Sequence, residues 1–308
     1  LLPVVLGICS AAKIPASRQL MPLAFACGLG GIITMVGTPP NIIANGALQA
    51  AGMKEQFGFF EYAWIGIPVT LAGMLYMMFL GKYLLPNKQI DADQEIEQEV
   101  EANETSASKQ IVSAVILLCV VLTMAIGIPG VSLEMAAIIG AIVAVLTGCL
   151  TEKQAYASID WVTIFLFAGM MPVSAAMDKT GAGKLIAEWA VSLMGGSPTP
   201  IIMTSVLFII SCTLTQFMSN TAACALLAPV GVAISQQLGA SPKAVLMAIG
   251  VAASCAFATP VGTPPCTLVL GPGGYKFMDY VKVGVPLVVL CFIVSIIVIP
   301  MVWPFFPG

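Results

Sequence analysis

The chain has 308 residues, 59% of them hydrophobic and only 9% charged, whereas soluble domains carry roughly 25% charged residues. Its mean hydropathy of +1.00 and its repeated apolar runs, each near the roughly 20 residues of a helical span, predict an all-α polytopic membrane protein. Because the chain has no histidine and no paired catalytic side chains at membrane depth, we expect neither zinc chemistry nor an enzyme.

The first predicted element is a broken apolar segment over residues 18–50. Its middle reads TMVGTPPN at residues 34–41. Two adjacent prolines remove two backbone donors and force the chain out of a helix, which is tolerated at membrane depth where the freed groups line a site. A continuous span over residues 61–82 follows, and residues 1–85 together form a first repeat.

An acidic segment separates this repeat from the middle of the chain. Seven of the fourteen residues from Asp91 to Glu104 are acidic, so residues 86–108 are predicted to form a solvated linker. Spans over residues 110–128, 133–150 and 160–177, with an interfacial helix after them, are predicted within a second region, residues 109–199. Trp64, Trp161 and Trp303 lie near span ends, as interfacial anchors do.

The last region, residues 200–308, repeats features of the first. An apolar stretch over residues 200–236 is interrupted by Ser219, Asn220 and Thr221, and we expect a re-entrant hairpin with these residues at its tip. A second broken segment over residues 243–271 reads TPVGTPPC at residues 259–266, and a last span covers residues 282–304. Paired interruptions in two halves point to the binding site of a transporter.

The two broken segments are copies of one another. Six of the twelve positions from Gly30 to Asn41 are identical to those 225 residues later. Beyond the loop, an offset of 218 aligns a second block, in which Phe59, Glu61, Tyr62, Gly66 and Pro68 match Phe277, Asp279, Tyr280, Gly284 and Pro286. A chance match of GTPP would not bring the second block with it, so we infer an internal repeat.

The cations predict the orientation of the chain. If the hairpin enters and leaves on one side, most lysines and arginines fall on the side of the acidic linker, and only Lys54, Lys179, Lys184 and Lys243 fall on the other. The positive-inside rule then places the linker in the cytoplasm. The two GTPP units consequently have opposite topology, which would bring both interruptions together near the membrane midplane.

The hairpin tip and the unwound loops offer oxygen atoms without formal charge. Hydroxyls, an amide and free carbonyls suit a hard cation such as sodium, whereas helix amino ends suit carboxylate or sulfate oxygens. No acidic residue lies beside these loops in the predicted spans, which favours sodium coupling over proton coupling. A lone polar cluster is more often interhelical glue and a lone Thr-Pro-Pro a kink, but their combination favours a site.

At these residues the chain resembles the divalent anion:sodium symporter family (SLC13 type), the sodium-dependent dicarboxylate and sulfate carriers. The resemblance rests on SNTAACALLAPV at residues 219–230, CAFATPVGTPP at residues 255–265 and GTPPNIIA at residues 37–44. It implies an inverted-repeat elevator transporter, a homodimer in the lipid of the bacterial inner (plasma) membrane, with no nucleic-acid partner. Residues 1–85 and 200–308 would form the moving transport part, and residues 109–199 the scaffold and dimer contact.

The resemblance also implies roles for individual residues. One sodium ion would be held by Thr215, Met218, Asn220 and Gly262, and Gly37 would contribute to a second sodium site. The anion would meet Asn220, Thr221, Ser219, Thr263, Thr38, Pro264 and Pro39. The expected function is sodium-coupled symport of a small divalent anion, a dicarboxylate or sulfate. The alternatives are a sodium-independent exchanger or efflux permease of related fold, and a non-transporting receptor or scaffold subunit.

Two features depart from the family pattern. Asn41 completes the first loop, but its mate in the second loop is Cys266, and we expect this lost amide to affect the substrate class. The first-half mate of the Ser-Asn-Thr cluster would fall before Leu1, and the chain has no initiator methionine. We therefore expect the chain to be the carboxy-terminal part of a longer protein.

Overall fold

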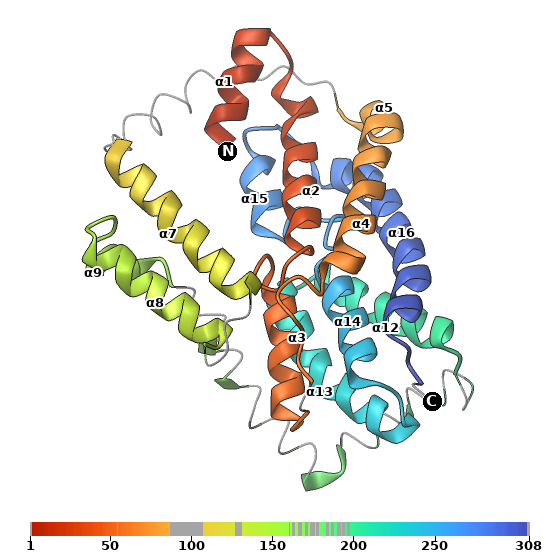
Figure 1. Cartoon of the computed structure of the whole chain (residues 1–308). Coiled ribbons are helices and arrows are strands. Elements are labelled where there is room, and N and C mark those ends of the chain that lie inside the picture. Colours follow the sequence, from red (N-terminus) through yellow and green to blue (C-terminus); the bar gives the residue numbers. More distant parts are fainter. Residues whose placement is uncertain are drawn as a thin grey trace. The chain divides into compact units, whose positions relative to one another are not determined.

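The computed structural model describes residues 2–53, 55–86, 107–126, 131–159 and 198–306, with scattered positions between residues 161 and 195. Every regular element assigned in these residues is helical, which confirms the predicted all-α fold class (Figure 1). The chain divides into two compact units, Leu1–Ile96 with Phe165–Gly308, and Glu97–Ile164. Most of the predicted acidic linker and much of the predicted span at residues 160–177 lie outside the described residues.

The larger unit contains two helices that are each interrupted at a GTPP sequence. In the first, α2 (Leu20–Gly31) ends before the unwound residues 32–38, and α3 (Pro39–Ala50) begins at the first proline. In the second, α14 (Pro242–Ala253) and α15 (Pro264–Leu270) flank the unwound residues 254–263. Proline suits a first helical position because its fixed φ is helical and its missing amide needs no partner there.

The structure describes further helices in this unit. They are α1 (Leu2–Ala12), η1 (Ala16–Arg18), α4 (Ala63–Tyr76), η2 (Met77–Gly81), α5 (Lys82–Leu84), α12 (Pro200–Thr215), α13 (Asn220–Leu238) and α16 (Phe277–Val302). Four stretches of helix in the described residues are long and apolar enough to cross a membrane: Ala63–Leu84, Lys109–Ile126, Asn220–Leu238 and Phe277–Val302. Three of them match predicted spans, and the fourth is α13, which was predicted to be an arm of the hairpin.

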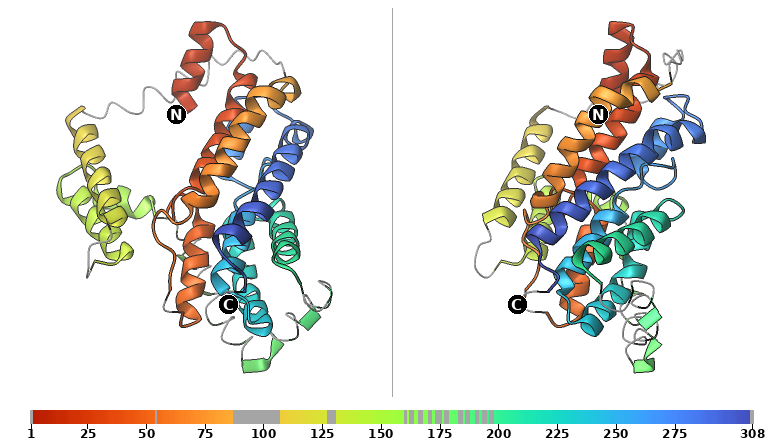
Figure 2. Two further views of the ribbon diagram at one scale, coloured as in Figure 1. Left: turned by 45° about the vertical axis from the view of Figure 1, so that its right-hand side comes forward. Right: turned by 90° about the vertical axis from the view of Figure 1, so that its right-hand side faces the viewer.

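The two broken helices pair crosswise. α2 packs against α15, and α3 packs against α14, so the first half of each broken helix lies beside the second half of the other (Figure 1). α13 packs on both α3 and α14, and α16 packs on α4 (Figure 2). Both GTPP segments therefore lie inside one helical assembly and are not separate bends in isolated helices.

The repeat extends to matching tyrosine hydrogen bonds. The hydroxyl of Tyr62 donates to the carbonyl of Asn41 at 3.0 Å, and the hydroxyl of Tyr280 donates to the carbonyl of Cys266 at 2.7 Å. These are the same two positions of the repeat. In each repeat the two halves of the broken helix are followed by a third helix, which is α4 in the first repeat and α16 in the second. Each tyrosine thus ties this third helix to the helix that starts at the prolines.

A pair of glycines packs each third helix against its unwound segment. A Cβ on Gly66 would lie 2.6 Å from the Cα of Ile33, and a Cβ on Gly284 would lie 2.8 Å from the Cα of Ala258. Real Cβ atoms do not approach so closely, so both positions need glycine for backbone contact. The partners are again equivalent in the repeat, which explains why glycine occurs in both aligned blocks.

The smaller unit contains α7 (Ala107–Ile126), α8 (Leu133–Leu146) and α9 (Glu152–Ala157). α7 packs against α8, and a Cβ on Gly140 would collide with the side chain of Val120, so the two helices approach closely. Thr151 starts α9 with a capping box, in which its side chain and that of Gln154 satisfy free backbone amides. Many apolar side chains of α7 and α8 are exposed within this unit, as expected for helices covered by lipid or another protein surface.

Candidate functional site

The predicted polar tip joins α12 to α13. α12 ends at Thr215 and α13 begins at Asn220, with residues 216–219 forming a short turn. Ser219 is the N-cap of α13, and its hydroxyl oxygen accepts a hydrogen bond from the amide of Ala222 at 3.2 Å. Ser219 therefore holds the helix start in place, while Thr221 is half-buried in the first turn.

Two of the predicted sodium ligands, Thr215 and Gly262, lie with the carbonyl of Ala253 around the side chain of a third, Asn220. The hydroxyl of Thr215 donates to this carbonyl at 2.7 Å and lies 2.6 Å from the side-chain amide of Asn220. When the Asn220 amide is turned, its nitrogen lies 3.1 Å from both the Ala253 and the Gly262 carbonyl oxygens. A hydroxyl, an amide and two carbonyl groups, all formally neutral, thus meet where the hairpin tip touches the second unwound segment.

The two orientations of the Asn220 amide have different chemistry. With its oxygen toward this group, Asn220 faces acceptors at Ala253 and Gly262, and such a set of oxygens fits a hard cation placed among them. With its nitrogen there, the amide donates hydrogen bonds to the same oxygens, which are then paired without an ion. The donor set therefore fits sodium, and it can also close without an ion.

Gly262 is required by this close approach. A Cβ at this position would lie 2.6 Å from the Cβ of Ala256 and 3.0 Å from the carbonyl oxygen of Thr215. Glycine thus lets the unwound segment press against the end of α12. Met218, the fourth predicted ligand, lies in the turn, where its amide donates to the carbonyl of Leu214 at 3.1 Å.

The first unwound segment reaches the same region from the other repeat. The hydroxyl oxygens of Thr38 and Ser254 are 3.4 Å apart, and the thiol of Cys224 in α13 donates to the carbonyl of Pro40 at 3.4 Å. Gly37 packs against Gly31, in the way that Gly262 packs against Ala256. Both GTPP loops and the hairpin therefore meet, and their role as one combined site stays a prediction.

Thr38 and Thr263 have matching environments. Each is the N-cap of its helix, with extended backbone angles (φ −146° and −134°), and neither side chain makes a capping hydrogen bond. Both side chains are buried. Pro39 and Pro264 follow them as exposed first residues of α3 and α15. The two threonine hydroxyls therefore accept no hydrogen bond from the amides of their own helices and can hydrogen-bond to a ligand.

Gln216 is a site residue that the sequence did not single out. Its side-chain nitrogen donates to the carbonyl of Cys255 at 3.1 Å, and its side-chain oxygen accepts from the amide of Ala258 at 3.1 Å. Its own carbonyl accepts from the hydroxyl of Thr259 at 2.8 Å. Gln216 thus fastens the hairpin tip to the second unwound segment. A buried glutamine directly beside Thr215 was the available signal.

Asn41, whose counterpart in the second loop is Cys266, makes a hydrogen bond within its own loop, and its expected effect on the substrate class stays a prediction. It is fully buried, and its side-chain nitrogen donates to the carbonyl of Thr34 at 3.0 Å. The amide therefore braces its own loop. The second loop has Cys266 in place of this asparagine. There the hydroxyl of the next residue, Thr267, donates to a loop carbonyl, that of Pro260, at 2.7 Å.

These features define an all-α polytopic membrane protein in which two unwound helix segments and a hairpin tip form one polar site. The chain belongs to the citrate transporter family: the CitMHS family model matches residues 1–181 and 125–306. The family and the four apolar helices make it an integral membrane protein, as expected, and relatives in Escherichia coli, Haemophilus influenzae and Staphylococcus are bacterial proteins. The family and these relatives are transporters, not enzymes.

Individual relatives agree with this family. An uncharacterized transporter of Haemophilus influenzae is 33% identical over 293 residues, which cover 89% of this chain and 60% of the relative. YfbS of Escherichia coli, also an uncharacterized transporter, is 43% identical over 51% of this chain and 26% of its own length. The sodium-dependent dicarboxylate transporter SdcS of Staphylococcus aureus is 26% identical over 94% of this chain and 59% of its own length. The chain thus spans about 60% of the relatives that it matches along most of its length.

Proposed function

We propose that the protein is a sodium-coupled symporter for a small anion with two or more negative charges, a dicarboxylate or sulfate. The observation that carries this proposal is the group formed by Thr215, Asn220, Ala253 and Gly262, whose neutral oxygens suit sodium. The resemblance of the chain to a transporter named as sodium-dependent supports it. Sodium is here a transported substrate, held for one passage across the membrane.

The anion would bind between the two unwound segments. Thr38 and Thr263 offer hydroxyls that do not cap their own helices, and Asn220 and Thr221 stand at the start of α13, where free amides favour negative charge. A bound sodium beside Asn220 would strengthen this attraction. Such a site would select substrates by their negative charge, whereas the size of the site would decide between dicarboxylate, tricarboxylate and sulfate.

The transport step would use the repeat. The crosswise pairing of α2 with α15 and of α3 with α14 supports an inverted repeat, in which the two segments alternate in access to the two sides. We propose that residues 1–85 and 200–308 move together as the transport part, and that residues 109–199 form the scaffold and the contact of a homodimer. The exposed apolar faces of α7 and α8 in the smaller unit support that assignment.

Uptake into proteoliposomes tests the function. The full-length protein should take up labelled succinate, citrate or sulfate faster with an inward sodium gradient than with an equal potassium gradient. Asn220→Ala should abolish the sodium stimulation. Gln236→Ala, an exposed amide on the same helix, is the matched control and should leave it intact. Stimulation that survives Asn220→Ala contradicts the assigned sodium site.

Two results would favour the alternatives. Flux that is equal with and without sodium would identify an exchanger or efflux permease of the same family. Ligand binding without any flux, measured on the same vesicles, would identify a receptor or scaffold subunit. The citrate named in the family description makes citrate the first tricarboxylate to compare with succinate.

A further inference from the structure

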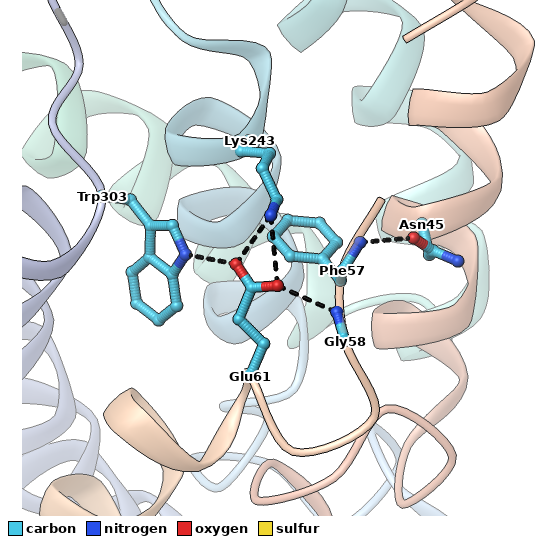
Figure 3. Close-up of polar contacts among 6 residues, drawn as sticks. All are labelled: Asn45, Phe57, Gly58, Glu61, Lys243 and Trp303. Carbon is cyan, nitrogen blue, oxygen red and sulfur yellow. Dashed lines mark hydrogen bonds and ion pairs between the residues drawn. The ribbon is translucent and has the colours of Figure 1, made fainter. Parts of the chain in front are cut away.

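An ion pair joins the two repeats at one end of the helical assembly. The amine of Lys243 lies 2.8 Å from one carboxylate oxygen of Glu61 and 3.1 Å from the other (Figure 3). The indole of Trp303 donates to the same carboxylate at 2.8 Å, as does the amide of Gly58. The charged side chains are only 19% and 22% exposed. Glu61 thus has four contacts in a setting where solvent screens little.

Lys243 lies on a helix that reaches the candidate site, and Glu61 lies in the segment that joins α3, which also starts at this site, to α4. Lys243 is in the first turn of α14, whose other end supplies Ala253 and Ser254 to the site. Glu61 follows α3 in the chain, and the segment before it is tied to that helix because Asn45 accepts from the amide of Phe57 at 2.9 Å (Figure 3). Twelve helical residues span about 18 Å, so the pair lies well away from Thr38.

Trp303 brings a third helix to this cluster. It follows the end of α16, and two residues later the carbonyl of Phe305 accepts from the amide of Ser241 at 2.6 Å, just before α14. The predicted interfacial anchor role for Trp303 is wrong, because the side chain is buried at 6% exposure against Glu61. Trp64, by contrast, is exposed.

The sequence repeat retains the signs of both charges. At the offsets of 225 and 218, Lys243 corresponds to Arg18 and Glu61 to Asp279. The backbone contacts of the acids also correspond: Glu61 accepts from the amide of Gly58, and Asp279 accepts from the amide three residues before it at 2.8 Å. An acid at this position therefore closes the turn at the start of the third helix in both repeats, since Glu61 lies just before α4 and Asp279 lies in the first turn of α16. Glu61 in addition reaches the opposite repeat.

We propose that Glu61 and Lys243 form a latch between the repeats, which fixes the spacing of α3 and α14 and so positions Thr38 against Ser254 at the site. They are positioning residues, far from any ligand. An ion pair with little exposure resists the loss of one partner, because the other charge is then left without compensation. The latch concerns the distance between two helices, so it does not depend on which ion or anion the site takes.

A disulfide reporter tests the latch without any transport measurement. Thr38→Cys and Ser254→Cys place thiols where hydroxyl oxygens are 3.4 Å apart, within reach of a disulfide. The full chain, with exposed Cys27 and Cys119 and partly exposed Cys149 replaced by serine, is oxidised in detergent and the rate of cross-linking is measured. Glu61→Gln and Lys243→Met should each slow the reaction by about threefold or more, in line with coupling between contacting residues.

The combined variants decide between a latch and general loosening. Glu61→Gln with Lys243→Met should be no slower than the slower single variant, and the exchange Glu61→Lys with Lys243→Glu should recover much of the rate. Glu55→Gln, an exposed acid in the same segment, is the matched control and should have no effect. Folding of each variant is checked by its melting temperature, and Trp303→Phe, which removes a single hydrogen bond, serves if the charge variants do not fold. Unchanged cross-linking in folded variants, or effects that multiply in the double variant, overturns the proposal.

Discussion

The neighbours of Glu61 stabilise the ionised form of its carboxyl group. Burial alone would raise the pKa of this carboxyl, but hydrogen bonds from Lys243, Trp303 and Gly58, with the positive charge of Lys243, bring the pKa below its ordinary value of 4.5. A carboxyl with a lowered pKa contributes stability above its unfolded pKa and loses it as the pH falls through the folded value. The ionised form of Glu61 is therefore the form that holds the structure.

The lowered pKa of Glu61 can be tested by measuring stability at different pH values. At pH 7 Glu61→Gln should melt at a lower temperature than the unaltered protein, and the gap should narrow as the pH falls below about 4. Glu55→Gln is measured in parallel for the general effect of acid. A gap that is independent of pH would show that the charge of Glu61 contributes nothing.

Gln216 gives a second prediction for a single residue. Gln216→Leu removes both side-chain hydrogen bonds to residues 255–258 and leaves the Ala258 amide without its partner, at a cost of about 1–3 kcal/mol. We expect lower thermal stability and weaker protection of the melting temperature by sodium. Gln237→Leu, on an exposed part of α13, is the control. Equal sodium protection in Gln216→Leu and the unaltered protein would contradict a bracing role at the site.

Trp303 shows why residue roles are hard to predict from a sequence. A tryptophan near the end of an apolar run has the pattern of an interfacial anchor, and Trp64 fits that pattern because it is exposed. Trp303 has the same local sequence signal but donates to Glu61, 242 positions away. The sequence pattern near one helix end does not contain information about such a distant partner.

At the scale of elements, the broken helices were the most predictable part. Pro39 and Pro264 start α3 and α15 as the GTPP motifs indicated, because two adjacent prolines remove two backbone donors from a preceding helix, whereas proline suits the first position of a new one. The lengths of the helices after the prolines were less predictable. α3 has 12 residues, whereas α15 has only 7 because the turns at residues 271–274 end it.

The glycines of the third helices provide a test at this scale. Gly284→Ala should be strongly destabilising, by about 1–3 kcal/mol, because its Cβ would overlap the carbonyl of Phe257. Gly30→Ala, in the helix α2, is the control, since no atom lies near the position of its Cβ. Denaturation of both variants in detergent compares them. A Gly284→Ala variant as stable as Gly30→Ala would mean that the segment after Phe257 is not packed on α16 as described.

At the scale of the molecule, the fold class, the repeat and the meeting of the three polar segments could be predicted from the sequence. Periodicity and duplicated motifs are local properties that the chain displays directly. The Glu61 ion pair and the Gln216 brace could not be predicted, because they depend on which helices lie side by side. The repeat contains one indirect signal, because Lys243 and Arg18 occupy equivalent positions and are both cationic. This signal indicates an ion pair only when the structure shows that Lys243 lies beside Glu61.

The orientation of the chain remains a prediction and can be measured directly. The count of cations places residue 55 outside and residue 282 in the cytoplasm. Single cysteines at Glu55 and Lys282 should therefore react from opposite sides with a membrane-impermeant maleimide, Glu55→Cys in intact cells and Lys282→Cys only after lysis. Both positions are exposed within their unit. Reaction of both from one side would contradict the opposite topology of the two repeats.

The crosswise pairing of the broken helices has a thermodynamic consequence. A ligand that orders residues 254–263 also restrains α14, and through it α3 and the loop that carries Thr38. Two cargoes bound at the two loops would thus share one ordering cost, so the first to arrive would lower the cost for the second. By reciprocity the half-saturating concentration of each cargo should fall as the other is added, and by the same factor.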